Sequence, residues 1–233
     1  MTGTLYGVGL GPGAPDLMTL RAARLIENAK VVAYPTLAGG SSFARAIAAD
    51  LIPASAEEIV MDVPMTTARE PAQAAYDAGA LRIAAALETG QDVICLCEGD
   101  PFFYGSFMYL FARLSTRFNV QIVPGVTSVT ACAASAKRPL VARNERLTVL
   151  PGPLPEPELR ARIDAAESVA IMKVGRHLAK IRSVLDGLGL TERAVYIERA
   201  SLPEEVVLPL AQAPDNAPYF SMILLTKGSD PWL

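Results

Sequence analysis

An acidic, glycine-containing turn follows an apolar run near the middle of the chain. Residues 96–105 read L-C-E-G-D-P-F-F-Y-G, and residues 92–97 have the apolar composition of a buried strand. Gly99 lets the backbone turn or approach a ligand closely, and Pro101 stiffens the turn. A turn of this kind between a strand and a helix is the usual ligand position of an open α/β sheet. A plain turn, with Asp100 bonded to nearby backbone amides, explains the stretch equally well when it is taken alone.

A second glycine-rich stretch, G-V-G-L-G-P-G at 7–13, overlaps the end of the expected strand at 5–10 and continues into a turn. Its spacing fits G-x-G-x-x-A, a pattern found in dinucleotide-binding turns. Pro12 and Pro15, however, remove amide donors that a phosphate cradle uses. The next expected strand, at 30–34, also ends without the acidic residue that binds a ribose. A nicotinamide cofactor is therefore disfavoured, which leaves another ligand loop or a simple tight turn.

A third turn, V-P-G-V-T-S at 123–128, follows an expected strand at 119–123. Thr127 and Ser128 stand where a helix over 129–136 begins, so hydroxyls and free backbone amides are available there. Helix capping and ligand contact are equally good interpretations of these two residues. Turns that each follow a strand are thus the candidates for binding chemistry.

Strands and helices alternate along the chain, which predicts an α/β fold with helices covering the sheets. The expected strands lie at 5–10, 30–34, 58–61, 92–97, 119–123, 146–150, 168–172, 194–197 and 219–226. The expected helices lie at 17–29, 42–52, 70–89, 105–117, 129–136, 156–166 and 177–188. Asp16 is expected to cap the first helix, and Ser41 or Ser42 the second. A boundary near residue 118 gives two α/β domains, 1–118 and 119–233.

The composition is that of a globular protein, because 51% of the 233 residues are hydrophobic and 19% are charged. A formal net charge of −3 argues against non-specific binding to nucleic acid. No uncharged apolar run reaches the length of a membrane span, and the first residues do not resemble a signal peptide. We therefore expect a cytoplasmic protein with no membrane or nucleic-acid partner.

The cysteines Cys95, Cys97 and Cys132 all lie in apolar surroundings, two of them at alternate positions of one expected strand. This pattern favours buried thiols in a reducing compartment over disulfides. A C-x-C pair with one distant cysteine and a single histidine, His177, lacks the usual spacing of zinc ligands. No metal site is expected.

The order of the three turns resembles that of the tetrapyrrole (corrin and porphyrin) methyltransferases, which use S-adenosylmethionine. The resemblance covers essentially the whole chain. Finer stretches resemble the branch that methylates precorrin-2 at C20: L-C-E-G-D-P-F-F-Y-G-S-F-M-Y-L, K-R-P-L-V-A-R-N-E-R-L-T-V-L-P-G-P and I-M-K-V-G-R-H. The resemblance implies the class III methyltransferase fold, in which two α/β domains hold the cofactor in the cleft between them. It also implies a homodimer.

The same resemblance implies a set of cofactor contacts, carried over position by position. They are Pro12, Glu98, Gly99, Asp100, Phe103, Thr127, Ser128, Met172 and Ala200. The first turn departs from the family pattern at one position. Ala14 stands where the family commonly has an acidic residue after G-P-G, and Asp16 follows two positions later.

The implied reaction converts precorrin-2 into precorrin-3A in cobalamin (vitamin B12) biosynthesis. Because this substrate is rich in carboxylates, cations at loop ends in the second half of the chain are expected to bind it. The substrate-binding candidates are Tyr104, Arg138, Arg143, Arg146, Lys173, Arg176 and His177. No catalytic residue is assigned. The alternatives are methylation of cobalt-factor II at C20, of another tetrapyrrole position or of a protein histidine, and a non-catalytic cofactor sensor.

Overall fold

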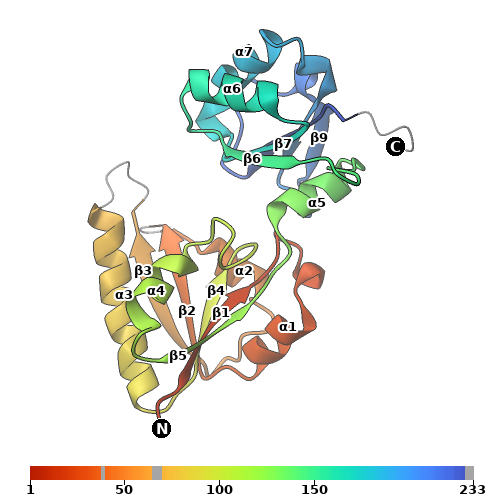
Figure 1. Ribbon diagram of the computed structural model, residues 1–233. Helices are drawn as coiled ribbons and strands as arrows, with labels where there is room; N and C mark the ends of the chain where they lie inside the picture. The colour runs from red at the N-terminus through yellow and green to blue at the C-terminus, as the bar shows by residue number, and fades with distance from the viewer. Residues whose placement is uncertain (38–39, 65–69, 229–233) are drawn as a thin grey trace. The chain divides into compact units, whose positions relative to one another are not determined.

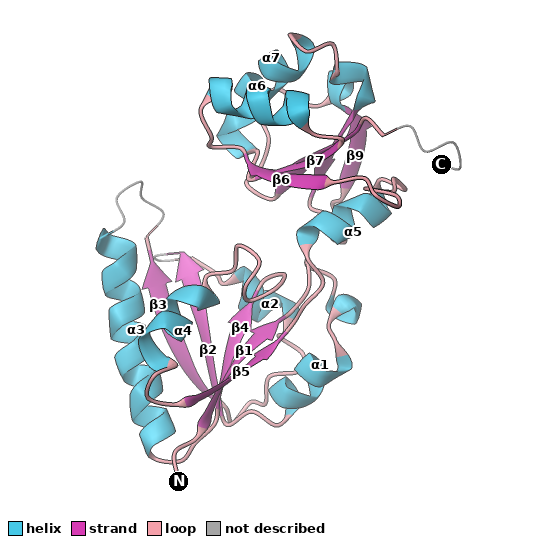
Figure 2. Cartoon of the chain, in the orientation of Figure 1, coloured by secondary structure: helices cyan, strands magenta, loops and turns pink. Residues whose placement is uncertain are grey.

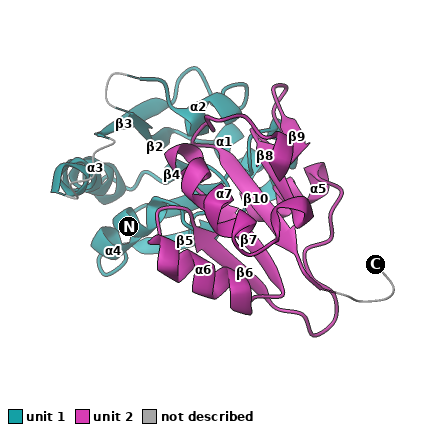
Figure 3. Cartoon of the chain, turned by 90° about the horizontal axis from the view of Figure 1, so that it is seen from above, with its two compact units in different colours: residues 1–127 teal, residues 128–233 magenta. Residues whose placement is uncertain are grey.

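The computed structural model describes residues 1–37, 40–64 and 70–228. The chain divides into two compact units, Met1–Thr127 and Ser128–Leu233, which are coloured teal and magenta in Figure 3. Each unit contains one five-stranded sheet together with helices. The predicted α/β class is therefore confirmed.

The sheet of the first unit is parallel throughout, with the strand order β3-β2-β4-β1-β5. Its strands are β1 (Thr4–Gly9), β2 (Val31–Leu37), β3 (Glu57–Val63), β4 (Val93–Cys97) and β5 (Asn119–Val123). Strand β1 lies between β4 and β5 (Figure 1). Because parallel strands end at the same edge of a sheet, the three turns singled out in the sequence are neighbours there.

Helices cover both faces of this first sheet (Figure 2). On one face lie α1 (Leu20–Glu27) and α2 (Phe43–Ile47). On the other face lie α3 (Glu70–Glu88) and α4 (Phe107–Leu114). The sheet is thus the middle of three layers, as an open parallel sheet requires.

Strand β4 is buried on both faces, as its nearly continuous apolar composition predicts. Cys95 and Cys97 belong to the core that β4 shares with α3 and α4, whereas Ile94 and Leu96 belong to the core on the side of α1 and α2. The thiols of Cys95, Cys97 and Cys132 are all buried and free, so the prediction of buried thiols without disulfides is confirmed.

The first helix begins later than predicted. Asp16 lies in a short 3₁₀ turn, Pro15–Leu17, and the backbone at Met18 is extended, which separates this turn from α1. The cap of α1 is Thr19, whose Oγ1 accepts a hydrogen bond from the Ala22 amide at 3.1 Å. The prediction that Asp16 caps this helix is wrong, because the chain turns before the helix starts.

A small polar network fixes the start of α2. Ser42 caps the helix, as predicted, by accepting a hydrogen bond from the Arg45 amide at 3.3 Å. The Arg45 guanidinium forms a two-pronged ion pair with Glu58 of β3, at 2.7 and 2.8 Å. The Tyr34 hydroxyl donates to the same carboxylate. These hydrogen bonds, from Arg45 first and Tyr34 second, lower the pKa of Glu58 to about 2.

Replacing Glu58 by glutamine is expected to lower the free energy of unfolding at pH 7 by about 1 kcal/mol, since the ion pair is partly exposed. The pKa of Glu58 falls from 4.5 to about 2 on folding. The stabilisation is therefore complete above pH 4.5 and is lost as the pH falls towards 2. Urea unfolding across this pH range measures the difference in the free energy of unfolding between the variant and the wild type. The control is Glu57→Gln at the exposed neighbouring residue. A difference that stays constant down to the lowest pH would contradict the ionic origin.

The sheet of the second unit is mixed, with the strand order β6-β7-β10-β8-β9. Its strands are β6 (Leu147–Pro151), β7 (Ser168–Met172), β8 (Ala194–Glu198), β9 (Val206–Pro209) and β10 (Ser221–Thr226). Strand β6 is parallel to β7, while β10 is antiparallel to both β7 and β8. Strands β7 and β8 therefore end at one edge of the sheet, where β10 begins.

The helices of the second unit are α5 (Ser128–Ser135), α6 (Glu156–Ala165) and α7 (Leu178–Asp186), with 3₁₀ turns η2 (Gly175–His177), η3 (Thr191–Arg193) and η4 (Leu210–Gln212). Helices α6 and α7 share one apolar core with β7, β8 and β10. Strand β9 was not predicted from the sequence. This strand is short, lies at the sheet edge and pairs only with β8 among the described residues, so its local pattern is weak.

The compact units divide after Thr127 rather than near residue 118. Strand β5 is the reason, because it pairs in parallel with β1 from Thr4 opposite Asn119 to Val8 opposite Val123. Residues 119–127 thus belong to the first unit. The partner of β5 lies at the start of the chain, so no local composition change marks the boundary.

Candidate functional site

The backbone itself joins the first two turns of the first unit. The Leu10 amide donates to the Cys97 carbonyl at 2.9 Å. Gly11 and Gly99 then exchange two hydrogen bonds, at 3.2 and 2.7 Å, in an isolated antiparallel bridge. Gly11 and Gly99 have φ values of 82° and 64°, in the left-handed region that favours glycine. The turn after β1 and the turn after β4 therefore form one continuous piece of backbone at the sheet edge.

Three glycines let the third turn join this pair at very close range. A Cβ added to Gly125 would lie 2.1 Å from the Gly99 carbonyl oxygen. A Cβ added to Gly9 would lie 2.6 Å from the Gly125 amide nitrogen and 2.7 Å from the same Gly99 oxygen. No side chain fits at either position without moving backbone. We call Gly9, Gly99 and Gly125 the glycine contact.

The carboxylate of Asp100 also binds the central turn to the third one. Its Oδ1 accepts hydrogen bonds from the amides of Phe102 and Phe103, at 2.9 and 3.1 Å. Its Oδ2 accepts one from the Gly125 amide at 3.0 Å. Hydrogen bonds to a charged acceptor are the stronger kind. Asp100 therefore bonds to nearby backbone, as one interpretation of the sequence expected, and it also positions a second loop, which no local pattern indicated.

Glu98 connects the central turn to helix α2. Burial raises the pKa of the Glu98 carboxyl group, and hydrogen bonds from the backbone amides of Glu98 itself and Ala44 oppose that rise. Ala44 lies in the first turn of α2. Glu98 as a whole residue is half-buried, and these backbone hydrogen bonds fix the position of its carboxyl group.

The aromatic residues after Pro101 form the outer part of the same edge. The rings of Phe103 and Tyr104 meet edge to face, with centroids 5.3 Å apart. Tyr104 is a non-glycine residue with a φ of 57°, a strained conformation that is concentrated at functional sites. Seven predicted site residues thus lie in three turns that are neighbours at one edge: Pro12, Glu98, Gly99, Asp100, Phe103, Tyr104 and Thr127.

In the second unit, the ends of β7 and β8 carry the next group of predicted residues. Met172 at the end of β7 is opposite Met222 of β10, and Glu198 at the end of β8 is opposite Ser221. Met172, Lys173, Arg176, His177 and Ala200 all lie in or directly after these strand ends. Lys173, Arg199 and Ser201 have φ values of 57°, 51° and 70°, so this edge also holds non-glycine residues in the left-handed region.

The histidine of this edge is surrounded by positive charge. Burial lowers the pKa of His177, and the nearby charges of Lys180 and Arg176 lower it further. His177 lies in the 3₁₀ turn η2, directly before α7. It is therefore biased towards the neutral form, which can both donate and accept a hydrogen bond.

Two of the predicted substrate cations lie at the opposite edge of the second sheet. The Arg138 Nε donates to Thr226 at the end of β10, at 3.3 Å. Arg146, directly before β6, pairs with Glu167, directly before β7, at 3.2 Å. Because β10 ends where β6 and β7 begin, these arginines do not join Lys173 and Arg176. Arg143 lies between α5 and β6, with a φ of 46°. The predicted cations thus lie at both edges of this mixed sheet, and their roles as substrate contacts stay predictions.

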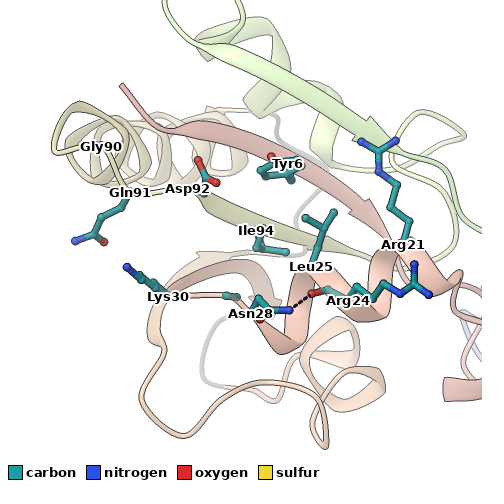
Figure 4. A pocket seen from close by; sticks show the side chains of 11 residues that line it. Tyr6, Arg21, Arg24, Leu25, Asn28, Lys30, Gly90, Gln91, Asp92 and Ile94 are labelled. Carbon is teal, nitrogen blue, oxygen red and sulfur yellow. Dashed lines mark hydrogen bonds between the residues drawn. The ribbon is translucent and has the colours of Figure 1, made fainter. Parts of the chain in front are cut away.

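A cavity of about 700 Å³ in the first unit lies away from these turns. Figure 4 shows Arg21, Arg24 and Lys30 around it, with Tyr6 and Ile94 from strands β1 and β4. Its lining includes the residues that directly precede β4, so it lies at the amino ends of the strands. None of the site residues predicted from the sequence lines it.

The chain is similar in sequence to several known proteins. The family model of the tetrapyrrole (corrin/porphyrin) methylases matches residues 4–214. The cobalamin biosynthesis protein CobIJ of Mycobacterium tuberculosis is 46% identical over 97% of this chain, but the match covers 46% of that protein. The chain thus spans about half the length of this CobIJ relative.

Two further relatives match over nearly their whole length. The precorrin-2 C(20)-methyltransferase of Sinorhizobium sp is 41% identical, with 98% of this chain and 97% of the relative covered. The cobalt-precorrin-2 C(20)-methyltransferase of Salmonella typhimurium is 34% identical, with 97% and 98% covered.

Solved structures give the same fold. The cobalt precorrin-4 methyltransferase CbiF has a TM-score of 0.74 and 26% identity, over 96% of this chain and 94% of that chain. The uroporphyrin-III C-methyltransferase of Thermus thermophilus, complexed with S-adenosylhomocysteine, has a TM-score of 0.67 and 26% identity, over 97% and 92% of the chains.

Proposed function

The chain belongs to the tetrapyrrole (corrin/porphyrin) methylase family, and from this premise we propose that it transfers a methyl group from S-adenosylmethionine to C20 of precorrin-2. The product is precorrin-3A, and the pathway is cobalamin biosynthesis. The observation that carries the choice of position is the 41% identity with the Sinorhizobium precorrin-2 C(20)-methyltransferase over almost the full length of both chains.

The three turns of the first unit fit a cofactor of this kind. The glycine contact keeps side chains away from the backbone at the sheet edge, so backbone amides and carbonyls can meet a ligand directly. Glu98 adds a carboxyl group whose position is fixed by α2, and Thr127 adds a hydroxyl group. We propose that these turns, with Pro12 and Phe103, bind S-adenosylmethionine. In the second unit we propose Ser128, Met172 and Ala200 as further contacts, as the resemblance implies.

When bound, S-adenosylmethionine supplies a methyl group on a sulfonium, so the protein does not have to provide an electrophile. The C20 carbon is made nucleophilic by the conjugated reduced macrocycle, so its attack on the methyl group would need no strong general base. The carbon–sulfur bond of the donor would break as the new carbon–carbon bond forms, S-adenosylhomocysteine would leave, and the ring would lose one proton. The work of the residues is then to hold the acceptor carbon in line and to exclude water. Placement of this kind supplies roughly 7–11 kcal/mol of barrier reduction.

We propose that the carboxylates of the substrate bind the cations Lys173 and Arg176, which follow β7. His177 lies next to Arg176 and, in the neutral form that its surroundings favour, can donate a hydrogen bond to a carboxylate. A guanidinium can hold a carboxylate by two parallel hydrogen bonds. Tyr104 is the proposed contact from the first unit. Arg138, Arg143 and Arg146 stay predictions as substrate contacts, although Arg146 already has Glu167 as a partner.

Replacing Arg176 by alanine is expected to raise the KM for precorrin-2 about 10- to 100-fold, the equivalent of a lost hydrogen bond between charged groups. The KM for S-adenosylmethionine is expected to stay within about twofold. Arg162→Ala is the matched control, because Arg162 pairs with Glu158 within helix α6. Steady-state kinetics with each substrate varied in turn makes the comparison. Equal kinetics for the Arg176 variant and the wild type would remove Arg176 from the site.

The proposed reaction is tested by incubating the protein with methyl-labelled S-adenosylmethionine and precorrin-2. The label is expected at C20 in the isolated product, located by NMR. Label at a different carbon would overturn the proposal of C20 as the methylated position, but it would still support a tetrapyrrole methyltransferase. Binding of both ligands without transfer would support a sensor instead.

The cobalt-loaded substrate is the second candidate, because a relative named cobalt-precorrin-2 C(20)-methyltransferase is 34% identical over nearly the full chain. The carboxylates of the metal-free and cobalt-loaded rings are alike, so binding groups alone do not discriminate. The ratio of kcat/KM for the two rings decides between them. A preference for the cobalt form would replace the metal-free substrate in the proposal.

We further propose a cytoplasmic homodimer with no nucleic-acid or membrane partner. The buried free thiols suit a reducing compartment. Within residues 1–37, 40–64 and 70–228, no helix is long and apolar enough to cross a membrane, and no group of His, Cys, Asp and Glu side chains could hold a metal ion. Light scattering coupled to gel filtration measures the oligomeric state, and a monomer mass would contradict the dimer.

A further inference from the structure

Two neighbouring aromatic side chains are exposed at the edge of the second sheet where β7 and β8 end. Tyr219 is 51% exposed and Phe220 is 47% exposed. Their rings meet edge to face, with centroids 5.3 Å apart. They lie directly before β10, whose first residue, Ser221, is opposite Glu198 at the end of β8. The sequence predicts a strand over 219–226, which includes both residues, and assigns no role to either.

Hydrogen bonds attach this aromatic pair to both loops that carry predicted site residues. The Phe220 carbonyl accepts from the Arg199 amide at 2.9 Å, which joins it to the loop after β8. The Ser221 hydroxyl accepts from the Gly175 amide at 3.3 Å and donates to the Pro218 carbonyl at 2.6 Å, which joins it to the loop after β7. Phe220 and the next residue, Ser221, are therefore bonded to both neighbouring loops, while Tyr219 and Phe220 stay about half exposed.

The two loops around the aromatic pair carry positive charge. Lys173 and Arg176 follow β7, and Arg199 follows β8. Within the described parts of the chain, Arg176 and Arg199 form no ion pair. Glu198, the acid at the strand end, accepts a hydrogen bond from the Tyr196 hydroxyl at 2.5 Å. The surface thus combines flat apolar rings with two guanidinium groups that have no ion-pair partner among the described residues.

We propose that Tyr219, Phe220 and Arg199 contact the tetrapyrrole acceptor, with the aromatic rings against the macrocycle and the guanidinium on a peripheral carboxylate. The inference rests on the proposed function and extends its substrate contacts. Charge favours the acceptor over the cofactor as the ligand of this surface. A conjugated polycarboxylate is complementary to apolar rings flanked by cations, whereas a sulfonium cofactor is itself positively charged.

The test uses the stable octacarboxylate uroporphyrin III as the probe of the acceptor site, with S-adenosylhomocysteine as the probe of the cofactor site. The double variant Tyr219→Leu/Phe220→Leu is expected to bind uroporphyrin III about tenfold more weakly, as the loss of two aromatic contacts implies. Arg199→Gln is expected to give a loss of similar size. Both variants are expected to bind S-adenosylhomocysteine within about twofold of the wild type in calorimetry.

The control is Tyr109→Leu on helix α4, which removes an aromatic side chain that is 42% exposed in the first unit. It is expected to bind both probes as the wild type does. Since the replaced side chains in the variants face solvent, thermal unfolding is expected to show intact folding. Steady-state kinetics adds a second measurement, in which the KM for precorrin-2 rises while kcat stays unchanged.

Three results would overturn the inference. One is unchanged uroporphyrin III affinity in both variants, and another is the absence of any wild-type binding. The third is weaker S-adenosylhomocysteine binding with unchanged uroporphyrin III binding, which would assign the aromatic pair to the cofactor. A failure of the proposed function is distinguishable, because it appears in the wild type as an absence of methyl transfer to C20.

Discussion

Replacement of Gly125 by alanine is expected to weaken S-adenosylhomocysteine binding about 100-fold or more and to abolish measurable turnover. The new Cβ would lie 2.1 Å from the Gly99 carbonyl oxygen and 2.9 Å from the backbone of Gly9. Both neighbours are backbone atoms of the turns proposed to bind the cofactor, so no side-chain rotation can relieve the clash. The turns must separate, and a displacement of about 1 Å at a reacting site can cost 100-fold.

A matched control separates this clash from the general cost of replacing a glycine. Gly189 has a φ of 67° and no atom within 4 Å of an added Cβ. Gly189→Ala is therefore expected to cost about 1 kcal/mol of stability through its backbone conformation while it leaves cofactor affinity intact. Gly9→Ala tests the same contact from the opposite side, since its Cβ would lie 2.6 Å from the Gly125 amide. Wild-type affinity in both the Gly9 and Gly125 variants would disprove the glycine contact.

Replacement of Asp100 by asparagine is expected to weaken S-adenosylhomocysteine binding about 10- to 100-fold while the protein stays folded. The carboxylate accepts three backbone hydrogen bonds, from Phe102, Phe103 and Gly125. An asparagine offers one oxygen, and its NH₂ group would face an amide donor. Each lost hydrogen bond to a charged group is worth about 1.5–3 kcal/mol. Calorimetric titration of the folded variant measures the loss.

Asp92→Asn is the matched control for the Asp100 variant. The Asp92 carboxylate also accepts a backbone hydrogen bond, from the Thr4 amide at 2.7 Å, but at the amino ends of the strands. Its replacement is expected to lower stability slightly and to leave cofactor affinity unchanged. If the two variants lose affinity equally, the effect belongs to the general stability of the first unit and not to the position of the third turn.

The sequence was sufficient to predict the elements around the site, because their signals are local. The apolar run before Glu98 predicted β4, and turn residues at Gly11, Gly99 and Gly125 predicted where three strands end. Strand alternation with helices predicted the α/β class. Once β1 pairs with both β4 and β5, these three turns must be neighbours.

The contacts that the sequence could not predict are those between distant segments. Gly125 was recognisable as a turn residue, but not as the partner of Gly99. The Asp100 bond to the Gly125 amide spans two loops, so no spacing rule contains it. Arg199 and the aromatic pair were overlooked because β10, the last described strand, lies between β7 and β8. Strand order of this kind is set by long-range pairing and not by local composition.

The position of β1 between β4 and β5 in the first sheet has a consequence during translation. Its neighbours are β4 and β5, and the pairing of Thr4 with Asn119 joins segments that leave the ribosome far apart in time. In the nascent chain, the edge of β1 that pairs with β5 must remain unpaired until Val123 has emerged from the ribosome. Folding of a sheet so rich in distant pairings is slow, and an exposed strand edge is the part that chaperones protect.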